Sequence, residues 1–537
     1  MHRLFRSIRT PRPTSRPTTR STRLRRVIAA PVAILGVGAL VLGAGAATAA
    51  AAPALSVGGV SYYVNCAAKT NGNGSASSPW NKAKSVNAHG AYSAGDHILF
   101  KRGTTCSGRL APLGSGAPGS PIVIGAYGSG AKPTINGGGT PNNTGTVRLL
   151  NQHDWTVQDL HLTNKVKTKT TKTYRAGLLF LNEGGKRLAN LTAQRLTVDN
   201  VVSSPVAGFH GPRLFGGIAA LTFGTRGDGF DHLQILHNAV SKVGRTGIVV
   251  NNAEYPASTD TDVRIGYDTV RQARGDSIIL IGVKGGRIDH SLSANGADFW
   301  PCPQCKKVSP ETANSGIWTA RSQNVRIDHN EVYGEHRLGG DGEGIDIDVS
   351  AKNTTVEANY VHDNQGGGLL ICNATDLTIR YNILENNTRA AIVFTTKKPS
   401  KNVHIYNNSI YVASSVKADS VVRTKQGFGA KGTQFFNNIV YSFGNSSYRF
   451  PGPLFSKANT FIGHHSKTEP KGAGTSHAYP GLRNPGHGSN GMKTVSGYRL
   501  QSTKGAQRGV AVPASVKTDF FGKKVNPKHP FRGASNG

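Results

Sequence analysis

Four carboxylates crowd one short stretch of this chain. The stretch, residues 339–348, reads GGDGEGIDID and contains Asp341, Glu343, Asp346 and Asp348. If it is a strand with its Ile residues pointing inward, Asp346 and Asp348 point outward on one face, about 6–7 Å apart. Cleavage of a glycosidic bond needs one protonated and one ionised carboxyl group, and crowding raises the pKa of at least one acid. We therefore take Asp346 and Asp348 as the primary catalytic candidates, with Glu343 and Asp341 as alternates.

Two other interpretations of this acid cluster stay open. Clustered carboxylates suit hard cations, and Ca²⁺ takes six to eight oxygen ligands, so the four acids could hold Ca²⁺ in a structural or lyase-type site. They could also be a solvated group that stabilises a turn. The expected separation lies between those of retaining and inverting glycosidases, so the sequence leaves the stereochemistry open.

A sequence repeat supplies the elements that would position these acids. The pattern apolar-x-apolar-x-x-Asn-x-apolar recurs, for example as VRIDHNEV (325–332), TTVEANYV (354–361) and LTIRYNIL (377–384). The Asn, or its substitute, occupies eight positions: Asn238, Asp268, Ser291, Asn330, Asn359, Asn382, Asn408 and Asn438. They are 23 to 39 residues apart, as expected for the coils of a right-handed parallel β-helix with insertions in its loops. We predict an all-β, single-stranded solenoid of roughly eight to eleven coils, with each Asn at a turn.

A second strand follows almost every Asn, and these strands can be aligned. Ile317 in SGIWTA aligns with an Ile of the acid strand, which places Trp318 beside Asp346 and Leu370 after it in the next coil. An indole beside carboxylates suits the C–H face of a sugar, so Trp318 is a candidate subsite platform; packing under a loop is the alternative. Asp276 aligns two coils before Glu343 and is a further catalytic alternate.

Four more residues are weaker candidates for substrate binding. Arg245 and Arg389 precede strands at equivalent positions and could bind a substrate acid or hydroxyl, or anchor a loop. His336 lies just before the acid cluster and could serve as acid or base. Trp300 lies on the longest insertion between coils, and long insertions often wall a groove.

The chain resembles the secreted right-handed parallel β-helix proteins of bacteria, the pectate-lyase-like superfold. Five stretches outside the repeats carry this resemblance: YYVNCAAKTNGNGSASSPW (62–80), GDHILFKRGTTCSG (95–108), SPIVIGAYGSGAKPTINGG (120–138), GYRLQSTKGAQRGV (497–510) and DFFGKKV (519–525). The resemblance implies the fold. It leaves the activity open, because the superfold hosts lyases, hydrolases, epimerases and non-catalytic adhesins.

The N-terminus has the pattern of an export signal. Residues 1–52 hold nine Arg and no acid, then an apolar run, then small residues of the A-x-A type. We expect a signal peptide over 1–52, an N-terminal cap with the first coils over 53–150, and the solenoid core over 151–445. A basic C-terminal extension over 446–537 is expected to pack on the helix. The protein would then be secreted, with no membrane contact after cleavage.

The five cysteines fit an exported protein. Cys66 and Cys106 bracket a compact N-terminal segment and could form a disulfide. Cys302 and Cys305 form a C-P-Q-C pair, for which we expect a small loop disulfide, because a single pair cannot complete a four-ligand zinc site. The remaining cysteine, Cys372, is expected to be a buried small side chain.

The net charge of +34 over 537 residues is unevenly distributed. Without residues 1–52 the chain has 54 basic and 29 acidic residues, a net charge of +25. Residues 449–537 carry 14 basic and 2 acidic residues, whereas residues 228–363 carry 13 and 19. We therefore expect an acidic groove with a basic periphery. The basic run at 164–175 lacks interleaved aromatics, so no nucleic-acid partner is expected, and closed solenoid ends favour a monomer.

These observations favour a secreted polysaccharide-degrading enzyme, most of all a glycoside hydrolase that needs no cofactor. The first alternative is a Ca²⁺-dependent uronate lyase; one lyase family pairs a strand Glu with a nearby Lys and an Arg in the next coil. Glu343 and Lys352 match that arrangement, but the next strand, 367–373, has no Arg. The second alternative is a non-catalytic glycan- or surface-binding β-helix.

Overall fold

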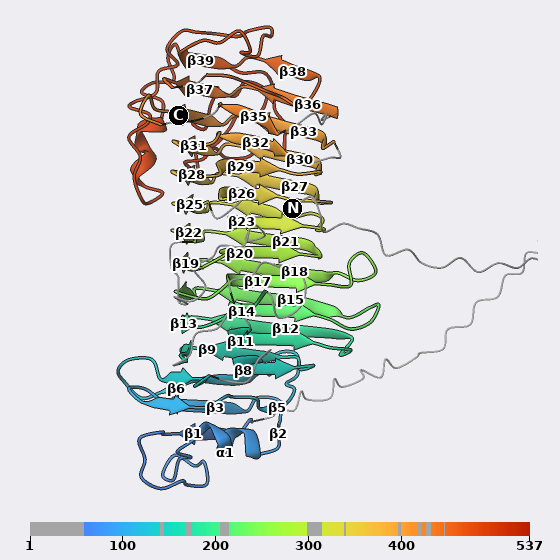
Figure 1. The fold of residues 1–537 in the computed structure, drawn as a ribbon, viewed down its shortest axis with the longest axis vertical. Helices are drawn as coiled ribbons and strands as arrows, with labels where there is room; N and C mark the ends of the chain where they lie inside the picture. The colour runs from blue at the N-terminus through green and yellow to red at the C-terminus, as the bar shows by residue number, and fades with distance from the viewer. Residues whose placement is uncertain are drawn as a thin grey trace, which may run out of the picture. The chain divides into compact units, whose positions relative to one another are not determined.

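The protein is a stack of coils built from three long parallel sheets (Figure 1). The computed structural model describes residues 58–139, 144–166, 173–204, 214–297, 314–337, 340–395, 399–416, 418, 420–425, 431–444 and 446–537. A complete coil contributes one strand to each sheet, whereas the coils at the two ends lack a strand of the third sheet. Within each sheet, every strand pairs in parallel with its counterpart in the next coil. This is the predicted parallel β-helix.

The first sheet has 14 strands and runs the length of the stack. Its strands alternate buried and more exposed side chains, as expected for a sheet with one face on the core. They are β1 (Ser61–Val64), β3 (His97–Lys101), β6 (Ile122–Tyr127), β9 (Trp155–Gln158), β12 (Arg187–Gln194), β15 (Gly229–Leu236), β18 (Asp260–Gly266), β21 (Val283–Asp289), β24 (Arg326–Asp328), β27 (Lys352–Glu357), β30 (Thr375–Arg380), β33 (Lys401–Tyr406), β36 (Lys431–Phe436) and β38 (Leu454–Lys457).

The second sheet has 13 short strands, and those from β16 onward directly follow the residues of the Asn repeat. They are β4 (Thr105–Ser107), β7 (Thr134–Asn136), β10 (His161–Asn164), β13 (Thr197–Val201), β16 (Ala239–Ser241), β19 (Thr269–Arg271), β22 (Leu292–Ala294), β25 (Glu331–Tyr333), β28 (Tyr360–His362), β31 (Ile383–Glu385), β34 (Ser409–Val412), β37 (Ile439–Ser442) and β39 (Thr460–Gly463).

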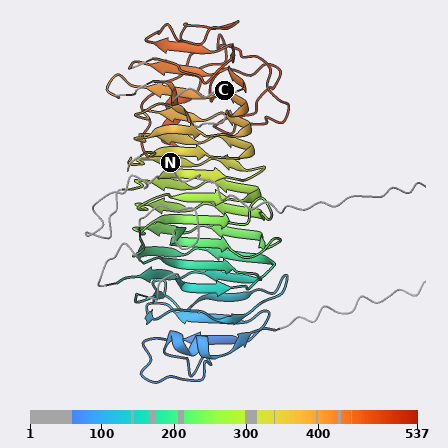
Figure 2. The same ribbon diagram turned by 45° about the vertical axis from the view of Figure 1, so that its right-hand side comes forward.

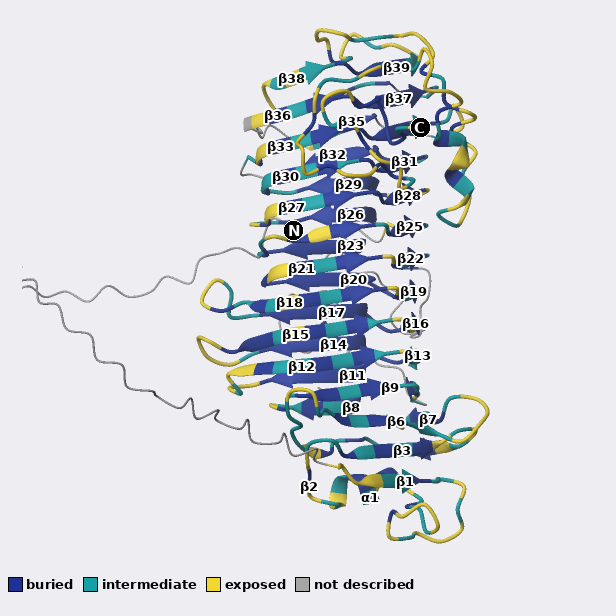
Figure 3. Cartoon of the chain, turned by 180° about the vertical axis from the view of Figure 1, so that it is seen from behind, coloured by how far each residue is buried: buried dark blue, intermediate teal, exposed yellow. Residues whose placement is uncertain are grey.

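The third sheet has ten strands, and its residues are buried on both faces along most of its length (Figure 3). Its strands are β8 (Thr144–Leu150), β11 (Arg175–Asn182), β14 (Gly216–Thr222), β17 (Thr246–Asn252), β20 (Ile278–Ile281), β23 (Ser315–Ala320), β26 (Glu343–Ile347), β29 (Gly367–Ile371), β32 (Ile392–Thr395) and β35 (Val422–Lys425). The first and second sheets have 14 and 13 strands, so the stack has more coils than the predicted eight to eleven. The prediction is too low because the first coils lack the Asn that marks the repeat.

The interior is filled by columns of identical or similar apolar side chains. Stacking coils 4.8 Å apart places each inward residue on its counterpart in the next coil, so one periodic position becomes a continuous core. In the third sheet a fully buried column consists of Ile218, Ile248, Ile278, Ile317, Ile345, Leu369 and Ile392.

The predicted Asn turn is a continuous ladder of hydrogen bonds. The backbone N–H of Asn330 donates to Asn359 Oδ1 at 2.9 Å, that of Asn359 to Asn382 Oδ1 at 3.0 Å, and that of Asn382 to Asn408 Oδ1 at 2.9 Å. All eight predicted positions belong to this ladder, which ends on a ninth residue, Asn459. The residue before each ladder position has a positive φ of 50–58°, which turns the chain from the first sheet into the second.

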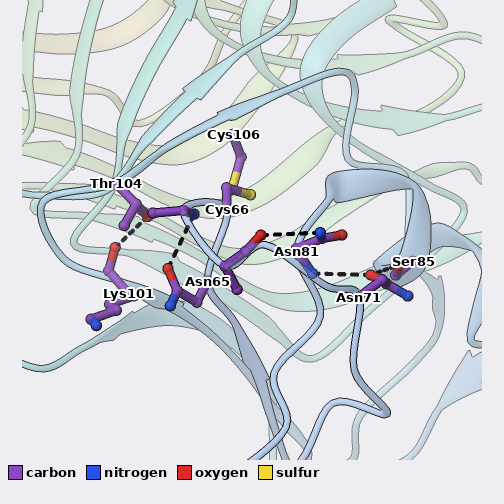
Figure 4. The surroundings of a disulfide bond; sticks show 10 residues. Asn65, Cys66, Asn71, Asn81, Ser85, Lys101, Thr104 and Cys106 are labelled. Atoms are coloured by element: carbon purple, nitrogen blue, oxygen red, sulfur yellow. Dashed lines mark hydrogen bonds between the residues drawn. A yellow bond between two sulfur atoms is a disulfide. The ribbon is translucent and has the colours of Figure 1, made fainter.

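The N-terminal cap is a small aromatic layer fixed by a disulfide. Helix α1 (Ala83–Ala88) and the paired strands β2 (Ala91–Tyr92) and β5 (Leu113–Gly114) cover the first coil. The disulfide between Cys66 and Cys106 ties the segment after β1 to β4, with Cα atoms 5.3 Å apart (Figure 4), which confirms that pairing.

The C-terminal segment packs on the outer face of the second sheet near its end (Figures 1 and 2). Tyr360, Ile383 and Ile439 of that sheet contact residues such as Leu482 and Tyr498, the latter in the 3₁₀ helix η3 (Thr494–Tyr498). No helix among the described residues is long and apolar enough to cross a membrane. The predicted signal segment lies outside the described residues.

Candidate active site on the third sheet

The outward face of the third sheet brings the predicted residues together in the expected register. Ile279 of β20 pairs with Trp318 of β23, Trp318 with Asp346 of β26, and Asp346 with Leu370 of β29. Asp346 is therefore one rung from the indole, as predicted. Asp348 follows directly after β26, and Glu343 begins that strand.

The carboxylates of β26 are almost excluded from solvent. The exposed fractions are 1% for Glu343, 5% for Asp346 and 8% for Asp348, while Asp341 is half-buried. Burial, followed by repulsion from Asp341, raises the pKa of Glu343 to about 8. Burial, followed by repulsion from Asp348, raises the pKa of Asp341 to about 6. Glu343 therefore keeps its proton at neutral pH.

Asp346 and Asp348 differ in what surrounds their charge. Burial raises the pKa of Asp346 well above its usual range, and the neighbouring acids raise it further. Burial also raises the pKa of Asp348, but hydrogen bonds from the Cys372 thiol and the Val349 N–H, with the charge of Arg321, oppose that rise. These opposing contributions make Asp348 the better site for a negative charge and Asp346 the better proton donor.

Two oxygens of β26 point to a missing partner. Among the described residues, Asp346 Oδ1 and Glu343 Oε2 are buried and have no hydrogen-bond partner. Buried polar atoms without partners are uncommon in folded proteins and carry a free-energy cost. Hydroxyl groups of a bound sugar would satisfy both atoms.

Asp276 is held by protein groups rather than open to substrate. Its Oδ2 lies 2.6 Å from Arg245 Nη2, and its Oδ1 accepts a hydrogen bond from the Ser315 N–H at 3.0 Å. It also accepts a hydrogen bond from the Trp318 indole. Both partners of the Asp276–Arg245 pair are buried. This placement favours a structural role for Arg245 and makes Asp276 a residue that orients Trp318.

The Trp318 ring is not an open platform in this structure. The residue is only 4% exposed and packs in an apolar cluster with Val249, Ile279 and Ile281. The expectation of a solvent-facing sugar platform is therefore corrected in favour of lateral packing. The sequence could have indicated this burial, because β17 and β20 have apolar residues on both faces. A sheet that is apolar on both faces is normally covered on both.

Three arginines lie near the acids or farther along the same column of the sheet. Arg389 Nη1 donates to Gly340 O at 3.2 Å and lies 3.9 Å from Glu343 Oε1, while Arg337 Nε donates to the same carbonyl at 3.3 Å. Arg423 of β35 occupies the outward column that contains Asp346, three rungs on. Burial, followed by the charges of the other arginines, lowers the pKa of Arg389 and Arg423. The surroundings of the acids thus contain cations as well as carboxylates, and the sequence did not single out Arg337 or Arg423.

Glu335 is a functional candidate that the sequence interpretation missed. It is fully buried at the turn between the second and third sheets, where its Oε1 accepts from Ser293 Oγ at 2.7 Å. Its N–H donates to Asn364 Oδ1, so it occupies the first position of a second, shorter ladder. Burial raises its pKa to about 8, and repulsion from Asp276 adds to the rise. The neighbouring candidate, His336, is half-buried, and its Nδ1 lies 3.3 Å from Gln365 Nε2.

The acids of β26 do not converge as metal ligands. Within the described ranges, no three of Asp341, Glu343, Asp346 and Asp348 place carboxylate oxygens within 4.8 Å of one another. A Ca²⁺ ion with ligands at about 2.4 Å needs such a spacing. The alternative interpretation, a Ca²⁺ site, would therefore require these side chains to move. Trp300, Cys302 and Cys305 lie outside the described residues.

The fold and the site define a right-handed parallel β-helix protein with a carboxylate cluster on its third sheet. A family profile described as "Right handed beta helix region" matches residues 224–411.

Among curated proteins, a lacto-N-biosidase of Bifidobacterium longum subsp. longum is 26% identical over 481 residues. The match covers 72% of this chain and 29% of that protein, so the chain spans less than a third of its relative.

Two solved structures share the fold. The native GH136 lacto-N-biosidase of Eubacterium ramulus superposes with a TM-score of 0.58 and 20% identity, over 69% of this chain and 67% of the other. The complex of XylC with xylose has a TM-score of 0.52 and 12% identity, over 89% and 98%.

Proposed function

We propose that the protein is a secreted glycoside hydrolase that cleaves a polysaccharide or oligosaccharide with the carboxylates of β26. The observation that carries this proposal is the contrast between two neighbouring buried carboxyl groups. Asp346 is surrounded by other acids, whereas Asp348 accepts hydrogen bonds from the Cys372 thiol and the Val349 N–H. The similarity to a protein named lacto-N-biosidase supports the same class of reaction.

The roles follow from the local environments. Asp346, with the more strongly raised pKa, donates the proton to the leaving oxygen. Asp348, held by the Cys372 thiol and the Val349 N–H, provides the ionised carboxylate that acts as base or nucleophile. Glu343 and Asp341 are alternates for the proton donor, because both pKa values are raised to between about 6 and 8.

The substrate reaches these acids from the C-terminal side. Trp318 and its apolar neighbours close the N-terminal side of Asp346, whereas the half-buried Arg423 lies three rungs to its C-terminal side. The half-buried Asp341 and the exposed Arg337 lie just before β26 in the same coil. The arginines bind hydroxyl or acidic groups of the glycan at this entrance. No cofactor is required by this chemistry.

One observation favours a polysaccharide lyase as a second candidate. The coil after β26 offers no Arg, but Arg389, from the coil beyond it, lies 3.9 Å from Glu343. Burial and the neighbouring cations lower the pKa of Arg389, which is the direction a base requires. An anionic sugar would then be held by the arginines, with Ca²⁺ as a possible neutralising ion after rearrangement of the acids.

A panel of glycans separates the two candidates. The panel includes an aryl glycoside of lacto-N-biose, neutral polysaccharides and polyuronates, each with and without EDTA. The hydrolase proposal expects new reducing ends without ultraviolet absorbance and no effect of EDTA. Unsaturated, ultraviolet-absorbing products that disappear with EDTA would establish the lyase instead. If no glycan is cleaved, the result would favour a non-catalytic glycan-binding protein.

A further inference from the structure

The loop that follows the last coil contains a second cluster of ionisable side chains, well away from β26 in the chain. His465, Glu469 and His477 place one ligand atom each within 4.8 Å of one another, and among the described residues they are the group of three that does so. We call them the His–Glu–His cluster. His465 Nδ1 lies 2.8 Å from Glu469 Oε2, and His477 Nε2 lies 2.7 Å from Glu469 Oε1.

The backbone holds both ends of this loop against the last coil. The N–H of His464 donates to Ser442 O at 2.7 Å, which fixes the residue before His465. The N–H of Ser476 donates to Asn459 O at 2.9 Å, and Ser476 O accepts from Phe461 N at 3.0 Å, which fixes the residue before His477. The two histidines, twelve residues apart, are therefore positioned by main-chain bonds to the solenoid rather than by chance contact.

The backbone of Glu469 is tied through Ser466 to the segment after the preceding coil. The N–H of Glu469 donates to Ser466 O at 3.1 Å, and Ser466 Oγ donates to Ser446 O at 2.8 Å. The Glu469 side chain is 11% exposed, while the two imidazoles are about half exposed. A nearly buried carboxylate thus presents both oxygens to two rings that solvent, and a solvated ion, can reach.

We propose that the His–Glu–His cluster binds a first-row divalent transition metal, Zn²⁺ in particular. Two imidazoles and one carboxylate are ligands that Zn²⁺ prefers, at about 2.0–2.2 Å, with solvent as a fourth ligand. Ligands of one such ion lie at most about 4.4 Å apart, so small rotations of the exposed rings complete the site. Imidazole is a poor ligand for Mg²⁺ and Ca²⁺, which distinguishes this site from the acid cluster. The ion would fasten the loop 464–477 across the end of the solenoid, where an end cap is needed.

Metal binding is tested on the full secreted chain without a histidine tag, after EDTA treatment and dialysis. Zn²⁺ is titrated by calorimetry, and the unfolding midpoint is followed with Zn²⁺, Mg²⁺ and Ca²⁺. We expect one saturable Zn²⁺ site per chain and a rise in the midpoint with Zn²⁺ alone, because an ion that binds the folded state stabilises it. Co²⁺ should add visible absorption bands of a low-coordinate site.

Variants locate the site. His477→Gln and Glu469→Gln should each abolish the Co²⁺ bands and the Zn²⁺-dependent rise in midpoint. His464→Gln is the matched control, since its ring faces Gly444 O and not the cluster, and it should bind as the native chain does. The proposal is overturned if the native chain shows no saturable site, or if His477→Gln binds as tightly as the native protein; the cluster would then be a hydrogen-bonded triad alone.

Discussion

Two columns of the solenoid follow opposite rules. In the turn between the first and second sheets, Asn recurs coil after coil, and each amide is satisfied by the next. On the outward face of the third sheet, the aligned residues Ile279, Trp318, Asp346 and Leu370 all differ, and Asp346 Oδ1 has no partner within the described residues. Repetition thus marks what the fold needs, and its interruption marks the residues that we propose for catalysis.

The largest effect on activity is expected for a substitution in the outward column of the third sheet. Asp346→Asn removes the proposed proton donor and should reduce glycan cleavage by about 10²–10⁴-fold. It also removes a buried, mutually repelling acid, so the unfolding midpoint should not fall. Initial rates and thermal unfolding are measured on the same preparation. A variant that loses stability together with activity would place Asp346 among the structural residues.

A substitution in the Asn ladder is expected to affect stability instead. Asn382→Ala deletes a side chain that accepts from the Asn359 N–H and donates to Val356 O and Asn408 Oδ1. Since buried partners are left unsatisfied, the free energy of unfolding should fall by about 3 kcal/mol. Denaturant unfolding measures this change, and Thr378→Ala, on the outer face of β30, is the control with little expected effect. A loss as small as the control's would mean that the ladder contributes little.

Glu335 combines features of both columns. It is an acid, and it occupies the first position of the second ladder, which continues through Asn364 and Asn387. Its pKa is raised from 4.5 to about 8, so the folded state retains a proton that the unfolded chain releases. Stability should therefore fall as the pH rises from about 4.5 to 8, by at most about 1.4 kcal/mol per pH unit for this group. Glu335→Gln keeps the acceptor for Ser293 and should flatten that slope in denaturant unfolding at several pH values. An unchanged slope would show that Glu335 ionises freely when folded.

The smallest effect is expected for Arg389, which lies next to Glu343 and influences its pKa. Its charge lowers the pKa of Glu343, so Arg389→Gln should raise that pKa further. If Glu343 shares in proton donation, the alkaline limb of the pH–rate profile moves up by less than about one unit. Arg423→Gln, farther from Glu343 along the sheet, should move it less. A downward shift, or equal shifts in both variants, would contradict the assigned contact.

Much of this architecture could be predicted because it is periodic. The ladder positions and the alignment of Trp318 with Asp346 follow from spacing and from the alternation of strand faces. The early coils were undercounted, because Leu196 and others stand where later coils have Asn. The burial of Trp318 was missed, since a periodic pattern says which face a residue takes but not what covers that face.

The remaining contacts could not be predicted because they depend on turns and on side chains that reach across coils. Glu335 lies at a corner, where strand alternation does not apply. Arg389 reaches back past β29 to Glu343, and a long side chain spans rungs that sequence alignment treats as separate. His465 and His477 meet through a loop whose path no local pattern predicts.

In the proposed function, the acids of β26 deliver water to a glycosidic bond. The most direct test is to run the cleavage in water enriched in heavy oxygen and to weigh the products by mass spectrometry, for the native chain and for Asp346→Asn. The account predicts one heavy oxygen at each new reducing end of the native products, and at least about a hundredfold less product from the variant. Products without heavy oxygen and lighter by one water, or undiminished turnover by the variant, would contradict it.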